Sequence, residues 1–78
     1  MGYKPTVVFD LDGVIHSYVS GWQGVDVIPD PPVPLIQEEI ERIRKAGYKV
    51  VVVSTRCTDP AGMDAVKNYL DVNGIVVD

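Results

Sequence analysis

Two continuous runs of β-branched and apolar residues constrain the fold of this chain more than any other feature. They are TVVFDL at residues 6–11 and KVVVVS at residues 49–54. Because neither run alternates with polar residues, each predicts a strand buried on both faces, as in a parallel sheet. Parallel neighbours need a crossover connection, and an amphipathic segment between the runs can supply it. The chain is therefore expected to be an α/β domain with right-handed crossovers.

Two segments carry the helical period, each with its own start or stop signals. The first places three isoleucines at helical spacing and ends at a C-cap glycine, Gly47. The second begins at Pro60 after an Asp59 N-cap and stops at Gly74. Residues 75–78 (IVVD) are predicted to begin a third strand.

The segment between the first strand and the first helix is predicted to form a flap. Two short apolar runs, residues 15–19 and 25–28, flank the glycine-bearing SGWQG, which is typical of a β-hairpin covering about residues 14–29. Trp22 at its tip is expected either to close over a substrate or to shield the hairpin. His16 is expected to be an exposed or hydrogen-bonded histidine rather than a catalytic one.

Length and composition exclude several classes of protein. The 78 residues fit one small domain, residues 1–78, with 46% hydrophobic and 23% charged residues. No apolar run approaches the roughly 20 residues that cross a bilayer, and no signal peptide is recognisable, so a cytoplasmic protein without membrane association is expected. A net charge of −4 without a basic run disfavours nucleic-acid binding. The single cysteine, Cys57, excludes an internal disulfide.

Polar residues follow both predicted strands at the point where each strand ends. Ligands of parallel α/β sheets bind outside the carboxyl ends of the strands. Asp78 is expected to approach this edge from the third strand. The same rule gathers five further residues there: Asp10, Asp12, Ser54, Thr55 and Arg56.

The spacing of Asp10 and Asp12 suggests metal and phosphate chemistry. Residues two positions apart on an extended chain point the same way, so both carboxylates are expected to face one site. Two close carboxylates repel each other unless a hard divalent cation lies with them, and Mg²⁺ is the natural candidate. With a phosphoryl substrate, one aspartate attacks phosphorus, while the other protonates the leaving oxygen and then activates water.

DLDGV (residues 10–14) and VVVVSTR (residues 50–56) resemble the first and second motifs of the haloacid dehalogenase-like (HAD) phosphohydrolases. The resemblance runs from Thr6 to the end of the chain, and the short flap is similar to that of capless members. It implies that Asp10 is the nucleophile and a Mg²⁺ ligand. It also implies that Asp12 is the general acid and base, with its backbone carbonyl as a second metal ligand.

The resemblance assigns the second motif to the substrate. Ser54 is implied to hydrogen-bond the phosphoryl oxygens, and Thr55 is grouped with it as phosphate-binding. Arg56 is similar to the basic residue on the substrate side in relatives whose second motif reads Ser-x-Arg.

The family's third motif, a lysine, and its fourth, an acidic pair after a later strand, are absent. Lys67, the only later lysine, falls inside the second predicted helix, and Asp78 ends the third strand rather than a later one. The chain is therefore expected to be the N-terminal portion of a Rossmann-like HAD core, β-flap-α-β-α-β, incomplete at its C-terminus.

Three functions stay open at this point. The first is a Mg²⁺-dependent phosphohydrolase acting through an aspartyl phosphate on a small phosphate monoester. The second is a catalytically incomplete remnant that binds Mg²⁺ or phosphate, or pairs with another chain, for instance as a homo-oligomer through open sheet edges. The third, a receiver domain, is disfavoured because receivers carry their phosphorylated aspartate on the third strand.

Overall fold

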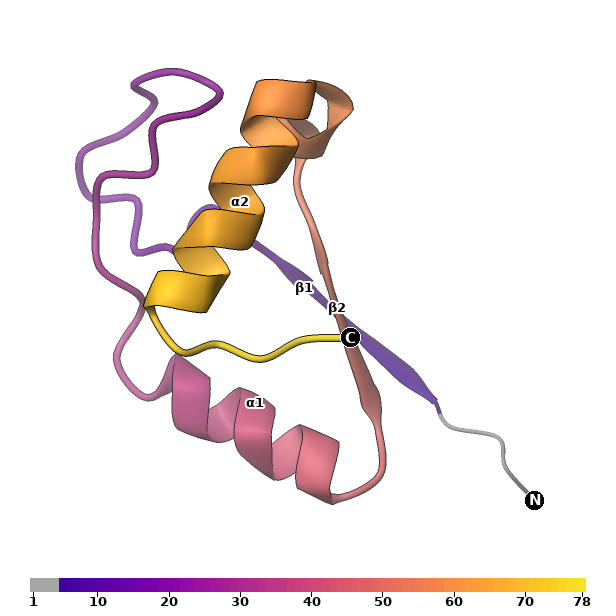
Figure 1. Cartoon of the computed structure of the whole chain (residues 1–78). Helices are drawn as coiled ribbons and strands as arrows, with labels where there is room; N and C mark the ends of the chain where they lie inside the picture. Colours follow the sequence, from indigo (N-terminus) through magenta and orange to yellow (C-terminus); the bar gives the residue numbers. More distant parts are fainter. Residues whose placement is uncertain (1–4) are drawn as a thin grey trace.

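A computed structural model describes residues 5–78 and confirms a small α/β fold with two parallel strands and two helices (Figure 1). The strands pair in parallel, with Thr6 opposite Lys49 and Asp10 opposite Val53. The elements follow in the order β1 (Thr6–Asp10), α1 (Ile36–Lys45), β2 (Lys49–Val53), the 3₁₀ turn η1 (Thr55–Thr58) and α2 (Pro60–Val72).

The two helices have the boundary signals that the sequence predicted. At the start of α2, the Asp59 carboxylate accepts a hydrogen bond from the Ala61 N–H at 2.8 Å, and Pro60 occupies the first turn. After α1, Gly47 adopts a φ of 99°, which turns the chain into β2. No helix in residues 5–78 is long and apolar enough to span a bilayer.

Both helices pack against one face of the two-stranded sheet. The opposite face is bare among the described residues, because Val8 and Val53 are 58% and 47% exposed. The prediction that the strands are buried on both faces is therefore wrong for this part of the chain. The buried core contains Leu11, Ile15, Ile40, Val50, Val66, Tyr69, Leu70 and Ile75.

Residues 14–35 form an irregular loop, so the predicted hairpin is wrong. No strand forms within this loop, and its isolated bridges join His16 to Asp12 and to Pro32. Tyr18 adopts a left-handed conformation, with a φ of 61°, which breaks the extended run that a hairpin arm needs. The loop instead folds back on the end of β1.

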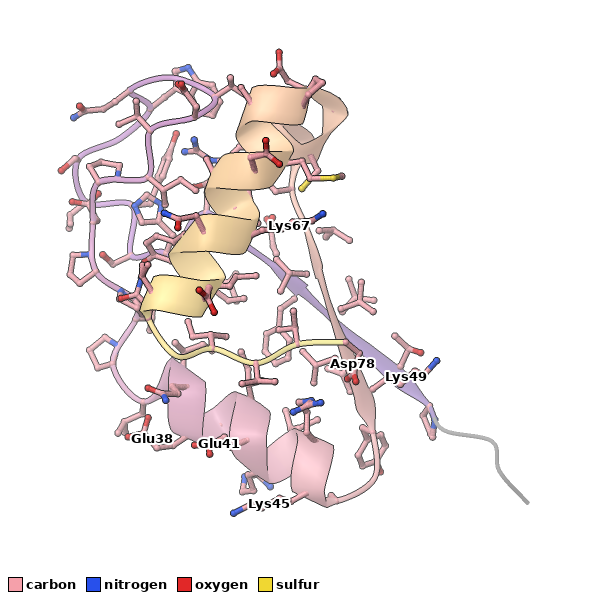
Figure 2. The ribbon with its side chains drawn as sticks, in the orientation of Figure 1. Glu38, Glu41, Lys45, Lys49, Lys67 and Asp78 are labelled. Atoms are coloured by element: carbon pink, nitrogen blue, oxygen red, sulfur yellow. The ribbon has the colours of Figure 1, made fainter. Side chains whose placement is uncertain are left out.

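Residues 75–78 form no strand in the described structure, and Asp78 lies away from Asp10. The Asp78 N–H donates to the Val50 carbonyl at 2.8 Å, and the Val50 N–H donates to Asp78 Oδ2 at 2.8 Å. Arg44 also forms an ion pair with Asp78, with 3.3 Å between Nη2 and Oδ1. Asp78 thus lies beside the first half of β2, near Lys49 (Figure 2), and its predicted approach to the carboxyl ends of the strands is wrong.

Candidate functional site

The carboxyl ends of β1 and β2 border an open hollow that contains three of the predicted site residues. Asp10 lies opposite Val53 in the register, which brings Ser54 close to it. The sequence did not point to Thr58, because the turn η1 that carries it has no distinct local signal. The hollow is lined by Val8, Asp10, Val53, Ser54, Thr55 and Thr58.

Asp10 presents an exposed carboxylate to this hollow. Its Oδ1 accepts a hydrogen bond from the Leu11 N–H at 2.9 Å, which fixes the side chain against the turn after β1. Within the described residues, Oδ2 has no hydrogen-bond partner. One carboxylate oxygen is therefore available for a ligand or for attack on one.

Ser54 and Thr55 bring hydroxyl groups to the same hollow. The Ser54 Oγ accepts a hydrogen bond from the Arg56 N–H at 3.1 Å and caps η1. Because the hydroxyl accepts in this bond, its proton stays available to an anion in the hollow. Thr55 is exposed, and its backbone carbonyl accepts from the Thr58 hydroxyl at 2.8 Å.

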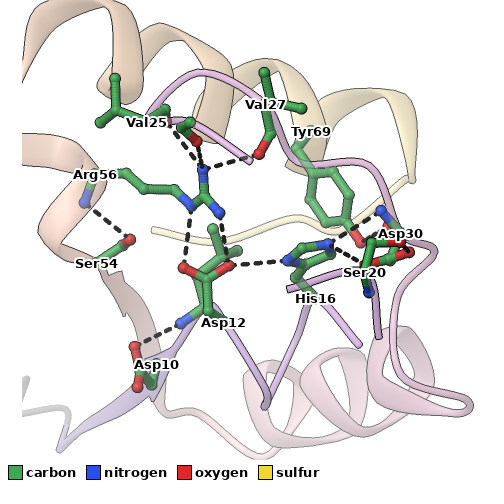
Figure 3. A network of polar contacts seen from close by, with 12 residues as sticks. Asp10, Asp12, His16, Ser20, Val25, Val27, Asp30, Ser54, Arg56 and Tyr69 are labelled. Atoms are coloured by element: carbon green, nitrogen blue, oxygen red, sulfur yellow. Dashed lines mark hydrogen bonds and ion pairs between the residues drawn. The ribbon is translucent and has the colours of Figure 1, made fainter. Parts of the chain in front are cut away.

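The Asp12 carboxylate points away from the hollow and into a buried polar network (Figure 3). Its Oδ2 accepts from Arg56 Nε at 3.0 Å, and its Oδ1 accepts from Arg56 Nη2 at 3.2 Å and from His16 Nδ1 at 2.9 Å. Burial acts to raise the pKa of Asp12, but the hydrogen bonds from Arg56 and His16, together with the charge of Arg56, outweigh it and lower that pKa. Asp12 is therefore held ionised and oriented.

Arg56 lies inside this network and not on the substrate side of the hollow. Its side chain is 0% exposed, and its Nη1 donates to the carbonyls of Gly24, Val25 and Val27 at 2.7, 3.0 and 3.0 Å. The Trp22 ring lies over the guanidinium, and its centroid is 4.6 Å from Arg56 Cζ. This geometry gives no support to the substrate-binding role that the resemblance implied for Arg56.

His16 joins Asp12 to the far end of the loop. Its Nε2 accepts from the Asp30 N–H at 3.1 Å, so the ring is the neutral tautomer with its proton on Nδ1. The Asp30 carboxylate accepts from the Ser20 hydroxyl and N–H at 2.6 and 2.7 Å, and these hydrogen bonds lower its pKa. The Tyr69 hydroxyl donates to the Asp30 carbonyl at 2.9 Å. His16 is thus hydrogen-bonded as predicted, whereas no local pattern pointed to its partners.

Neither Lys67 nor Asp78 supplies the charges that the family's later motifs carry. Lys67 projects from α2 (Figure 2) and lines a groove beside β2 together with Asp78. Neither residue lines the hollow that contains Asp10.

The described residues offer Mg²⁺ one exposed carboxylate, that of Asp10, and form no complete metal site. No group of three or more His, Cys, Asp or Glu side chains in residues 5–78 is arranged to hold a metal ion. Mg²⁺ often takes only one or two carboxylates, however, and completes its shell with water and phosphate oxygens. The exposed Asp10 carboxylate suits this binding mode, whereas the Asp12 carboxylate is occupied by Arg56 and His16.

Comparisons of the chain with family models, with curated proteins and with solved structures gave no match.

Proposed function

We propose that this chain is a Mg²⁺-dependent phosphohydrolase domain that takes a phosphate monoester into the hollow at the carboxyl ends of β1 and β2. The observation that carries this proposal is the exposed Asp10 carboxylate beside the hydroxyls of Ser54 and Thr55. The resemblance of DLDGV and VVVVSTR to the first two HAD motifs supports the same chemistry.

In the proposed reaction, Asp10 Oδ2 attacks phosphorus, the ester P–O bond breaks and an aspartyl phosphate forms. Ser54 and Thr55 donate hydrogen bonds to the phosphoryl oxygens, where negative charge is concentrated. Mg²⁺, when bound by the Asp10 carboxylate and the Asp12 backbone carbonyl, supplies further neutralisation of this charge.

Asp12 is the proposed acid and base of the two steps. Its lowered pKa suits the second step, in which an ionised carboxylate accepts a proton from the water that hydrolyses the aspartyl phosphate. Donation of a proton to the leaving oxygen in the first step requires a protonated Asp12, which the contacts with Arg56 and His16 oppose. The lowered pKa therefore suits only the second step, and that step also requires the Asp12 carboxylate to turn from Arg56 and His16 toward the hollow.

A second candidate function is a non-catalytic domain that binds phosphate or Mg²⁺, or pairs with another copy of the chain. The bare sheet face favours it, because Val8 and Val53, which also line the hollow, expose apolar surface. Among residues 5–78, no lysine or arginine side chain lines the hollow to complete a charge clamp.

Hydrolysis of an aryl phosphate, with Mg²⁺ and with a chelator, tests the proposal. Metal-dependent turnover is expected, and Asp10→Asn is expected to lower it on the order of 10³-fold because the nucleophile is lost. Asp64→Asn, which removes an exposed carboxylate from α2, is the matched control and should retain turnover. Equal turnover in the wild type and in Asp10→Asn rejects the proposal. Phosphate binding or self-association without turnover favours the second candidate.

A further inference from the structure

We infer that Arg56 is a positioning residue that couples the orientation of the Asp12 carboxylate to the docking of the loop segment at residues 22–27. One edge of the guanidinium, Nε and Nη2, binds Asp12, whereas Nη1 binds three loop carbonyls. An effect of this coupling on catalysis depends on the proposed function. The coupling itself does not depend on it.

The burial of Arg56 makes the two sets of contacts interdependent. A guanidinium has only donors and keeps its charge, so a fully buried one needs both a counter-charge and acceptors. If Asp12 lost its charge, an unpaired cation would lie beneath the loop, and the loop would open to admit water. If the loop segment moved away, water would solvate Nη1, and the ion pair between Arg56 and Asp12 would become exposed to solvent.

The loop contacts the Asp12 carboxylate by two routes, one through His16 and one through Arg56. Near the start of the loop, His16 donates directly to Asp12 and accepts from the backbone of Asp30, near the end of the loop. In the middle, Trp22 covers the guanidinium that holds Asp12. A change in the docking of the loop therefore reaches Asp12 through two different side chains.

Packing of α2 fixes the backbone of Arg56 and leaves the loop as the movable partner. A Cβ placed on Gly62 would lie 2.0 Å from the Arg56 carbonyl oxygen and 2.8 Å from Val25 Cγ2. The helix thus rests directly on the backbone of Arg56 and on the loop. Movement in this network is expected in the loop segment, which has no helix or strand of its own.

Amide hydrogen exchange by NMR tests the coupling on the intact chain without metal or substrate. Asp12→Asn is expected to speed exchange of the Val27 N–H, which donates to the Gly24 carbonyl at 3.3 Å, by about tenfold or more. Asp10→Asn is the matched control, because Asp10 has no contact with Arg56 among the described side chains, and it should change this rate less than about twofold. Unchanged exchange in Asp12→Asn, or equal acceleration throughout α1, overturns the inference.

A milder pair of variants covers the case in which Asp12→Asn does not fold. Trp22→Ala removes the ring from the guanidinium, and it is expected to shift the His16 Nδ1–H resonance, which reports on Asp12. Val19→Ala, at a loop residue that is 81% exposed, should leave that resonance in place. An unchanged His16 signal in Trp22→Ala overturns the inference. Because neither readout needs turnover, a chain without hydrolytic activity can still confirm the coupling, and an active chain can still refute it.

Discussion

Gly62→Ala is expected to destabilise the chain even though alanine is the better helix former. The added Cβ would lie 2.0 Å from the Arg56 carbonyl oxygen and 2.9 Å from the Arg56 carbonyl carbon, and backbone atoms cannot turn aside as a side chain can. Overpacking of this kind costs about 3 kcal/mol at the upper end of its usual range. The gain in helix propensity offsets about 1 kcal/mol. The free energy of unfolding should therefore fall by about 2 kcal/mol.

Thermal and urea denaturation, followed by far-UV circular dichroism, measure this change. For a domain of this size, a loss of about 2 kcal/mol corresponds to a Tm lower by roughly 8–16 °C. Lys67→Ala, at an exposed position of the same helix, is the control and should change stability by less than about 0.5 kcal/mol. A higher Tm for Gly62→Ala would show that propensity outweighs the clash, and it would refute the close approach of α2 to Arg56.

Three further predictions concern the buried polar groups. Tyr69→Phe removes the hydrogen bond to the Asp30 carbonyl and should lower the free energy of unfolding by about 1–2 kcal/mol in urea denaturation, whereas no change would argue against that bond. Burial, with the charges of Asp30 and Asp12, raises the pKa of Tyr69 to about 12. Absorbance at 295 nm should therefore show one late-titrating tyrosine that is absent from Tyr69→Phe, and stability should fall as pH rises from about 10 to about 12. Because the pKa of Asp12 is lowered, its ionised form stabilises the fold at neutral pH, and this contribution is lost as pH falls below about 4. Asp12→Asn should show a smaller acid-induced loss in urea denaturation, and an identical pH profile would contradict the assignment.

The two strands that form, the two helices and part of the site could be predicted because their signals are local. The valine runs, the Asp59 cap and the glycine after α1 each act within a few residues. Asp10 and Ser54 could then be brought together by a single topological rule, since parallel neighbours end at the same edge of the sheet.

The loop and the role of Arg56 could not be predicted, because both depend on contacts between distant parts of the chain. Alternating apolar residues around SGWQG resemble the arms of a hairpin, whose carbonyls would be satisfied by a strand ladder. In the structure, Arg56 satisfies the carbonyls of Gly24, Val25 and Val27 from a turn about thirty residues further along the chain. No local pattern in the loop sequence predicts that its carbonyls accept hydrogen bonds from Arg56.

The parallel register of β1 and β2 also governs how the molecule assembles in time. Because Thr6 pairs with Lys49, the sheet forms only after the chain has closed a loop that contains α1 and the whole irregular segment. Closing such a distant contact is entropically costly and slows folding. The ion pair between Asp12 and Arg56 joins the same two distant regions. No local fragment of the chain therefore preassembles this ion pair, which forms together with the sheet.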